Sequence, residues 1–142
     1  MSKLKDKQTK KKLKSLKLLL LRTKLFLDRC EWMIDQVGSA LQWIHSKNLC
    51  HLDVKLENIL VFRSDFSLVK LCDFGSVKPS GDIVIKKNEL LPYCPAELVA
   101  KHANEWYQVD RVQDVFQFGI VVFFCLQGVL PWQKVDIDIS HI

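Results

Sequence analysis

The chain has 142 residues, of which 49% are hydrophobic and 26% are charged. This length corresponds to about one domain, and a chain this apolar is not disordered throughout. The net charge of +5 is unevenly distributed, because residues 1–24 hold ten of the 21 basic residues and a single acid. The five cysteines form no C-x-x-C pair, which favours reduced thiols and therefore a cytoplasmic or nuclear location.

The first 27 residues form a basic leader that we expect to be flexible or helical. Its lysines are compatible with contact to nucleic acid or to an acidic membrane, and the lysine run at residues 10–12 with nuclear import. The simpler interpretation is a solvated segment without a partner. The apolar run Leu18–Leu21 is too short to cross a membrane, so we expect no transmembrane segment.

The next predicted elements are a helix and a hairpin. Apolar residues recur at helical spacing after Asp28, which is a suitable N-cap. We therefore expect an amphipathic helix that begins after Asp28 and ends near Asn48. Two β-prone runs, residues 58–62 and 68–72, follow it on either side of a polar turn. They predict a β-hairpin.

The second half of the chain is predicted to be irregular and then helical. Residues 79–95 contain three prolines and Gly81, which is typical of irregular structure. Residues 114–126 predict a helix that is apolar nearly all round. Such a helix must be covered by other elements, so any part of it left exposed is a candidate surface for a protein partner.

Several motifs resemble those of eukaryotic protein kinases, in the same order along the chain. Residues 51–58 read HLDVKLEN and are similar to the catalytic loop H-R-D-x-K-x-x-N, and residues 73–75 match the magnesium motif D-F-G. Residues 95–97 (PAE) are similar to A-P-E, and residues 114–119 (DVFQFG) to the D-x-W-x-x-G opening of the central large-lobe helix.

The resemblance covers residues 28–134 and ends with Leu130-Pro131-Trp132. Residues 91–98 and 114–121 are similar to the small Ser/Thr kinase subfamily named for binding Src-homology-three domains. It implies a protein kinase-like α+β fold, in which residues 28–142 form part of a mainly α-helical large lobe with a short β-hairpin. The small β lobe is expected to be missing from this sequence.

The resemblance also implies the chemistry. Asp53 would be the base that takes a proton from a substrate hydroxyl, and Lys55 would balance charge on the transferred phosphoryl group. Asn58 and Asp73 would bind magnesium, which prefers oxygen ligands, and together with Lys55 they would bind ATP. The D-x-K pattern resembles kinases that act on serine or threonine in protein substrates.

Other residues are assigned supporting roles. Gly75 is expected to let the backbone turn after Phe74, and Asp114 to anchor the catalytic-loop backbone. A zinc site is a weaker alternative because its candidate ligands have no standard spacing. Those candidates are His45, Cys50, His51 and Cys72. The residues assigned a supporting role are His51, Phe74, Gly75, Glu97 and Asp114.

Departures from the family pattern leave two functions open. No glycines have the spacing of a phosphate-binding loop, and no V-A-I-K lysine is found, so ATP binding is expected to be weakened. Leu52 replaces the arginine of H-R-D, and Glu89-Leu90 replaces a small G-T pair. The chain is then either a truncated and impaired Ser/Thr protein kinase domain or a non-catalytic kinase-like fragment that acts as an interaction module.

Overall fold

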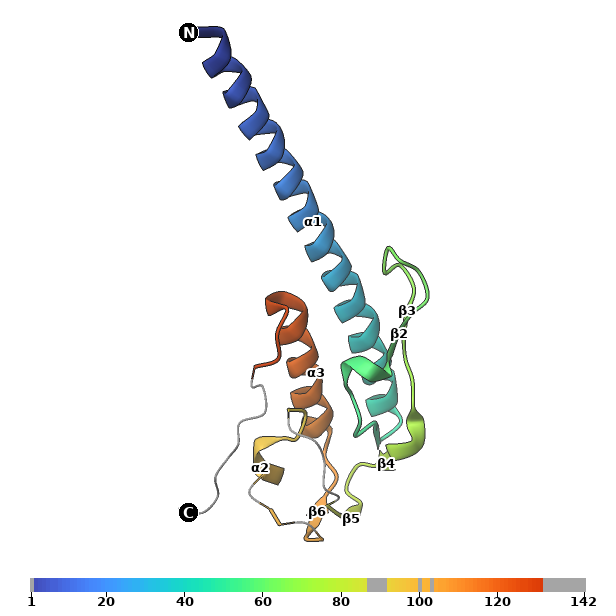
Figure 1. Cartoon of the computed structure of the whole chain (residues 1–142). Helices are drawn as coiled ribbons and strands as arrows, with labels where there is room; N and C mark the ends of the chain where they lie inside the picture. Colours follow the sequence, from blue (N-terminus) through green and yellow to red (C-terminus); the bar gives the residue numbers. More distant parts are fainter. Residues whose placement is uncertain (1, 87–91, 100, 103, 132–142) are drawn as a thin grey trace, which may run out of the picture.

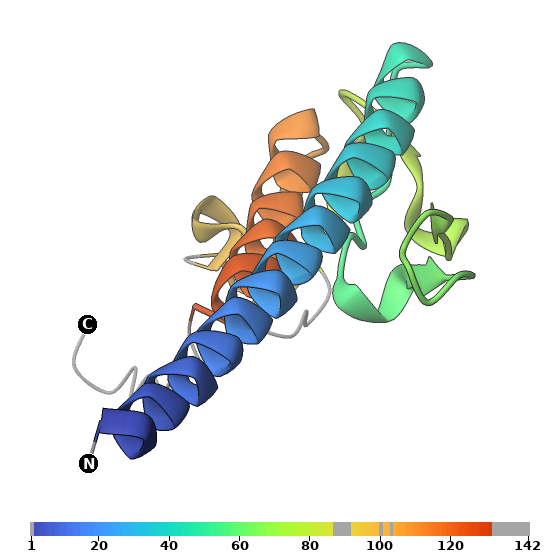
Figure 2. The same cartoon turned by 90° about the horizontal axis from the view of Figure 1, so that it is seen from above.

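The computed structural model describes residues 2–86, 92–99, 101, 102 and 104–131, with side chains from residue 14 onward except that of Ala96. One long helix, α1 (Ser2–Ser46), packs against the rest of the molecule with its C-terminal half, and its N-terminal half projects away from it (Figure 1). A second helix, α3 (Arg111–Gln127), packs against one side of its C-terminal half. A hairpin of the strands β2 (Ile59–Val61) and β3 (Val69–Leu71) packs against the other side, as the view from above shows (Figure 2).

Helix α1 is longer than the sequence predicts. The interval from residue 2 to residue 37 contains no glycine or proline and many lysines and leucines, which are good helix formers. The N-cap prediction for Asp28 is wrong, because the helix passes through this residue without a break. The predicted end is confirmed, since the helix stops at Ser46 and Asn48 takes a left-handed φ of 58°.

The predicted hairpin is confirmed. Strand β2 (Ile59–Val61) pairs antiparallel with β3 (Val69–Leu71), and Leu60 lies opposite Lys70. The turn is closed by Asp65, whose carboxylate accepts hydrogen bonds from the backbone and hydroxyl of Ser67. Gln36 of α1 ties the hairpin to the helix, because its Oε1 accepts the N–H of Val69 at 2.8 Å.

The segment predicted to be irregular contains short strands. Strand β4 (Lys78–Pro79) pairs with β1 (Leu49–Cys50), and β5 (Ile83–Ile85) pairs with β6 (Trp106–Gln108). A single helical turn, α2 (Ala96–Val99), lies between β5 and β6 in sequence. The prediction is therefore wrong at residues 83–85. The partners of β4 and β5 lie more than twenty residues away in sequence, and local proline and glycine content does not report such pairings.

Helix α3 begins earlier than predicted. Asp110 is its N-cap and forms a capping box with Gln113, so the helix starts at Arg111 rather than at Asp114. It ends at Gln127, where Gly128 takes a left-handed φ of 72°. The side of α3 that faces α1 is buried, and the opposite side is exposed in the described part of the chain. The exposed apolar side chains are Val112, Val115, Phe123 and Leu126.

The hydrophobic core lies where α1, α3 and the hairpin meet. Helix α1 contributes a stripe of buried side chains at helical spacing, and Val54, Val69 and Val121 fill the space between the three elements. The α1 stripe consists of Cys30, Met33, Val37, Leu41 and Ile44. Three residues that the sequence analysis named for the kinase resemblance lie outside the described residues: Glu89, Leu90 and Trp132.

Candidate active site

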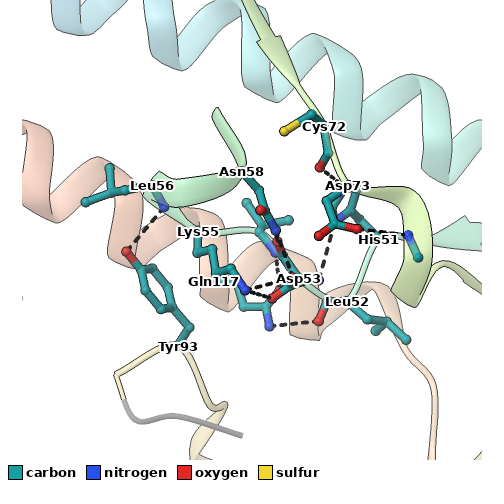
Figure 3. A network of polar contacts seen from close by, with 12 residues as sticks. His51, Leu52, Asp53, Lys55, Leu56, Asn58, Cys72, Asp73, Tyr93 and Gln117 are labelled. Carbon is teal, nitrogen blue, oxygen red and sulfur yellow. Dashed lines mark hydrogen bonds and ion pairs between the residues drawn. The ribbon is translucent and has the colours of Figure 1, made fainter. Parts of the chain in front are cut away.

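The loop between β1 and β2 brings together the two predicted catalytic side chains, Asp53 and Lys55, and the predicted magnesium ligand Asn58. Lys55 Nζ donates to both carboxylate oxygens of Asp53, at 2.8 and 2.9 Å. Asn58 Nδ2 donates to the Asp53 carboxylate and also to its backbone oxygen, each at 2.8 Å (Figure 3). The hydrogen bond to Asp53 raises the pKa of Lys55. The Asp53 carboxylate is therefore oriented from two directions while about a quarter of its side chain (27%) stays accessible.

Asp114 holds the backbone of this loop from below. Its side chain is fully buried, and its two oxygens accept the N–H groups of His51 and Leu52, each at 2.7 Å. His45 of α1 supplies a third contact, because its Nε2 lies 2.7 Å from the same carboxylate. Since a carboxylate only accepts, Nε2 of His45 is the donor. Asp114 thus links α1, the loop and α3.

Gln117 is a second anchor from α3 that the sequence did not single out. Its Oε1 accepts the N–H of Val54 at 2.9 Å, and its Nε2 donates to the oxygen of Leu52 at 3.3 Å. Gln117 follows Asp114 by three residues, so the two lie on the same helical face. The signal that could have identified it is that Gln117 is the one polar side chain in the otherwise apolar run of residues 115–126, three positions after Asp114.

Leu52 has a left-handed backbone, with a φ of 65°. This conformation is unfavourable for a leucine and costs about 1–3 kcal/mol. It persists because both of its backbone polar groups are fixed by α3, the N–H by Asp114 and the oxygen by Gln117. With Leu52 in this conformation, the side chain of the next residue, Asp53, points toward Lys55 and Asn58.

His51 joins the loop to the D-F-G segment. Its Nε2 lies 3.2 Å from the oxygen of Cys72, and its Nδ1 lies 3.3 Å from the N–H of Asp53. These partners require that Nε2 carries the proton and that Nδ1 accepts, which is the neutral imidazole. Burial lowers the pKa of His51, in agreement with the neutral form. The ring of Phe74 packs edge-on against it, with centroids 5.2 Å apart.

Asp73 lies beside this loop at the start of the short 3₁₀ helix η2 (Phe74–Ser76). The left-handed residue of D-F-G is Asp73, with a φ of 61°, and its Oδ1 accepts the N–H of Gly75 at 3.2 Å. Gly75 is needed for a different reason from the one expected. A Cβ on Gly75 would lie 3.2 Å from Oδ1 of Asp73, so the glycine allows the close approach of that carboxylate.

Tyr93, which was not among the predicted residues, and Glu97, which was, lie in two different places. Tyr93, in the segment before α2, reaches the catalytic loop, where its hydroxyl accepts the N–H of Leu56 at 3.3 Å. Burial raises the pKa of Tyr93. Glu97 does not join the cluster, because it is exposed on α2 and lines a separate groove of about 400 Å³ with Lys101 and Trp106.

The alternative zinc site does not form in the described part of the chain. No three histidine, cysteine, aspartate or glutamate side chains there are grouped so that they could hold a metal ion. None of the five cysteines forms a disulfide bond. Nor does any helix in the described ranges combine the length and apolarity needed to cross a membrane.

A family model described as the protein kinase domain matches residues 8–142. The chain belongs to this family. The catalytic-loop motif, the D-F-G motif and the motif that begins at Asp114 of α3 predicted the assignment, and the prediction is confirmed. The match begins within the basic part of α1.

The similar proteins are serine/threonine-protein kinases. The kinase meng-po of Drosophila melanogaster is 45% identical over 108 residues, which are 75% of this chain and 24% of that protein. SBK1 of Danio rerio is 40% identical over 101 residues, 71% of this chain and 26% of that kinase. SBK2 of Homo sapiens is 33% identical over 100 residues, 70% of this chain and 29% of that kinase. The chain thus spans about a quarter of the length of these relatives, and the predicted subfamily is confirmed.

Proposed function

We propose that this chain carries the large-lobe half of an active site that transfers a phosphoryl group from ATP to serine or threonine hydroxyls of protein substrates. The observation that carries the proposal is the Asp53 carboxylate, held by Lys55 and Asn58 on a loop that α3 anchors through buried side chains. A pre-oriented carboxylate of this kind is what removal of a hydroxyl proton requires.

Each residue of the loop has a defined task in this proposal. Asp53 would accept the proton of the substrate hydroxyl as its oxygen bonds to the γ-phosphorus, while the bond from that phosphorus to the β–γ bridging oxygen breaks and ADP leaves. Lys55, which is 32% exposed, can turn from Asp53 toward the transferred phosphoryl oxygens and stabilise their negative charge. Leu52 and its anchors keep the Asp53 backbone in place during the transfer, so that little reorganisation is needed.

The residues present fit a magnesium ion held jointly with ATP. The two Nδ2 contacts of Asn58 to Asp53 leave its Oδ1 as the atom that faces a cation, and Asp73 supplies a carboxylate. One carboxylate and one amide oxygen are few ligands, and Mg²⁺ commonly completes such a set with phosphates and water. Bound Mg²⁺·ATP supplies the phosphoryl group and the positive charge that neutralises its oxygens.

The same reasoning sets an expectation for the 142-residue polypeptide tested alone. It contains no glycine-rich loop and no V-A-I-K lysine, which in kinases contact the phosphates of ATP from the opposite side. We expect this polypeptide to bind Mg²⁺·ATP weakly and to transfer phosphate poorly, with the affinity that remains coming from Asn58, Asp73 and Lys55.

Calorimetric titration with ATP, with and without Mg²⁺, tests the cofactor part of the proposal. Asp73→Asn should weaken the Mg²⁺-dependent binding at least about tenfold, because it removes the only charge that the chain gives the ion. Asp65→Asn is the matched control, since Asp65 is an exposed aspartate in the hairpin turn. Equal binding by the two variants, or binding that does not depend on Mg²⁺, would contradict the assignment.

The transfer step is tested in a chimera that places the small lobe of the similar Drosophila kinase before residue 28. With radiolabelled ATP and a peptide mixture, we expect labelled phosphoserine and phosphothreonine but no phosphotyrosine. Asp53→Asn should lower kcat by about 10²–10⁴-fold, the usual contribution of a general base. Labelling that survives this substitution would show that Asp53 is not the base.

The second candidate is a non-catalytic interaction module. The exposed apolar side of α3, including Val115 and Leu126, supports it because such surfaces are typical of interfaces. This candidate predicts that Mg²⁺·ATP changes the melting temperature of neither the wild type nor Asp73→Asn. The kinase candidate predicts a rise for the wild type only.

A further inference from the structure

Helix α1 extends well beyond the body of the molecule (Figure 1). The end of α3 reaches α1 at Cys30, whose thiol donates to the oxygen of Cys125 at 3.3 Å. Every residue from 14 to 27 is exposed, and we call this segment the overhang. Nothing in the described part of the chain covers it, although it contains seven leucines and one phenylalanine.

One face of the overhang continues the core stripe of α1. At about 100° per residue, five apolar residues of the overhang fall on the side that leads into Cys30 and Met33. They are between 47% and 62% exposed. Thr23 lies at the centre of this face, and its hydroxyl donates to the oxygen of Leu19 at 3.0 Å, so it presents its methyl group. The five residues are Leu16, Leu19, Leu20, Phe26 and Leu27.

This face leads into a cavity at its lower end. The cavity has a volume of about 510 Å³ and lies between α1, the hairpin and the end of α3. Its lining is almost entirely apolar, and Phe26 belongs both to the lining and to the face of the overhang. Face and cavity together form one continuous apolar surface, which we call the groove; it is concave at the cavity, and its part on the overhang is one face of a single helix about three turns long. The lining includes Cys30, Met33, Ile59, Phe66 and Phe124.

Basic residues follow both borders of the groove. Lys17 and Lys24 lie on one border, and Arg22 and Arg29 on the other, each pair seven residues apart and therefore aligned along the helix. Residues 14–27 contain no acid. An occupant of the groove thus meets apolar side chains in the middle and positive charge on both sides.

We propose that the groove binds an amphipathic helix of a partner protein, with apolar residues at helical spacing and acidic residues on both borders. Such a helix satisfies the leucines and the bases at once. A second copy of this chain would bring like charges together, because residues 1–24 alone hold ten bases and one acid. A flat lipid surface does not enter the cavity between α1, the hairpin and the end of α3, and so fills only the part of the groove on the overhang. Nucleic acid would contact the basic residues but would leave the leucines of the groove exposed to water.

The test uses the 142-residue chain and a labelled three-heptad peptide with leucine at positions a and d and glutamate at e and g. Fluorescence anisotropy should show that this peptide binds at least about tenfold more tightly than the same peptide with lysine at e and g. The preference should shrink as the salt concentration rises. A lysine peptide that binds equally well would overturn the charge assignment.

Two matched double variants locate the binding face. Leu19→Glu with Phe26→Glu changes the groove, whereas Leu18→Glu with Leu25→Glu makes the same charge change on the opposite side of α1, at leucines that are 53% and 48% exposed. The first should lower affinity at least about tenfold more than the second, since both repel the peptide at long range but only the first changes the contact. Both variants should melt like the wild type, because all four residues lie outside the core.

Other results would overturn the proposal. Equal losses in the two double variants would show that the groove is not the binding face. If the chain does not bind the peptide, but light scattering shows a dimer that only the groove variant abolishes, the groove binds a second copy of the chain. If the chain does not bind the peptide, but floats with vesicles of phosphatidylcholine and phosphatidylserine and only the groove variant abolishes this flotation, the groove binds lipid.

Discussion

The buried carboxylate of Asp114 should be the most sensitive single group in the fold. It accepts the N–H groups of His51 and Leu52 and a hydrogen bond from His45, all at 2.7 Å. Asp114→Ala removes the acceptor and leaves these donors without that partner, where the carboxylate itself is fully buried and the His45 side chain is 16% exposed. Because the same carboxylate holds the left-handed backbone of Leu52, the substitution also frees the loop that carries Asp53.

The magnitude follows from the number of donors left unpaired. A buried donor that loses its partner costs roughly 1–3 kcal/mol, so two backbone N–H groups and one imidazole predict a loss of about 3–5 kcal/mol after partial relaxation. Asp110→Ala is the matched control, because it makes the same chemical change on the same helix. It removes only an N-cap and should cost about 1 kcal/mol.

Urea unfolding followed by tryptophan fluorescence measures both losses. With a slope of about 1.5 kcal/mol per molar, the midpoint should fall by about 2 M or more for Asp114→Ala and by about 0.7 M for Asp110→Ala. Asp114→Asn, which keeps one acceptor oxygen, should lie between them. Equal midpoints for the two alanine variants would refute the view that this carboxylate holds the loop to α3.

Three further predictions concern other parts of the structure. Burial lowers the pKa of His51 below its ordinary 6.5, so the unfolded chain takes up a proton at a higher pH than the native state does. Stability should then fall as the pH drops below about 6.5, and an equal pH dependence in His51→Gln would contradict this. Burial raises the pKa of Cys125 to about 11, so iodoacetamide at pH 8 should modify the half-buried Cys72 before Cys125. Mass spectrometry maps the order of modification, and earlier modification of Cys125 would contradict the prediction. Gln36→Ala removes the acceptor of the Val69 N–H and should lower the free energy of unfolding in urea by about 1–2 kcal/mol. Gln42 is exposed on the same helix, and Gln42→Ala should lower it by less than about 0.5 kcal/mol. Equal losses would show that Gln36 does not hold the hairpin to α1.

The features that could be predicted from the sequence depend on short stretches of chain. The hairpin at residues 59–71 and the end of α1 follow from β-prone runs, turn residues and apolar spacing, all of which act locally. The motif residues of the catalytic loop carried the family assignment in the same way, because their order along the chain is itself informative. None of these inferences needed a contact between distant residues.

The features that only the tertiary structure decided depend on such contacts. Gln117 is an ordinary polar residue until α3 packs beneath the catalytic loop and its amide meets Val54 and Leu52. Asp28 has the chemistry of an N-cap, but good helix formers on both sides carry α1 through it. The pairing of β5 with β6 joins residues more than twenty positions apart. The sequence by itself therefore determined the family and the catalytic loop, because motif and periodicity are local. The anchors of that loop and the groove beside the overhang were decided by packing between distant segments, which local propensity does not encode.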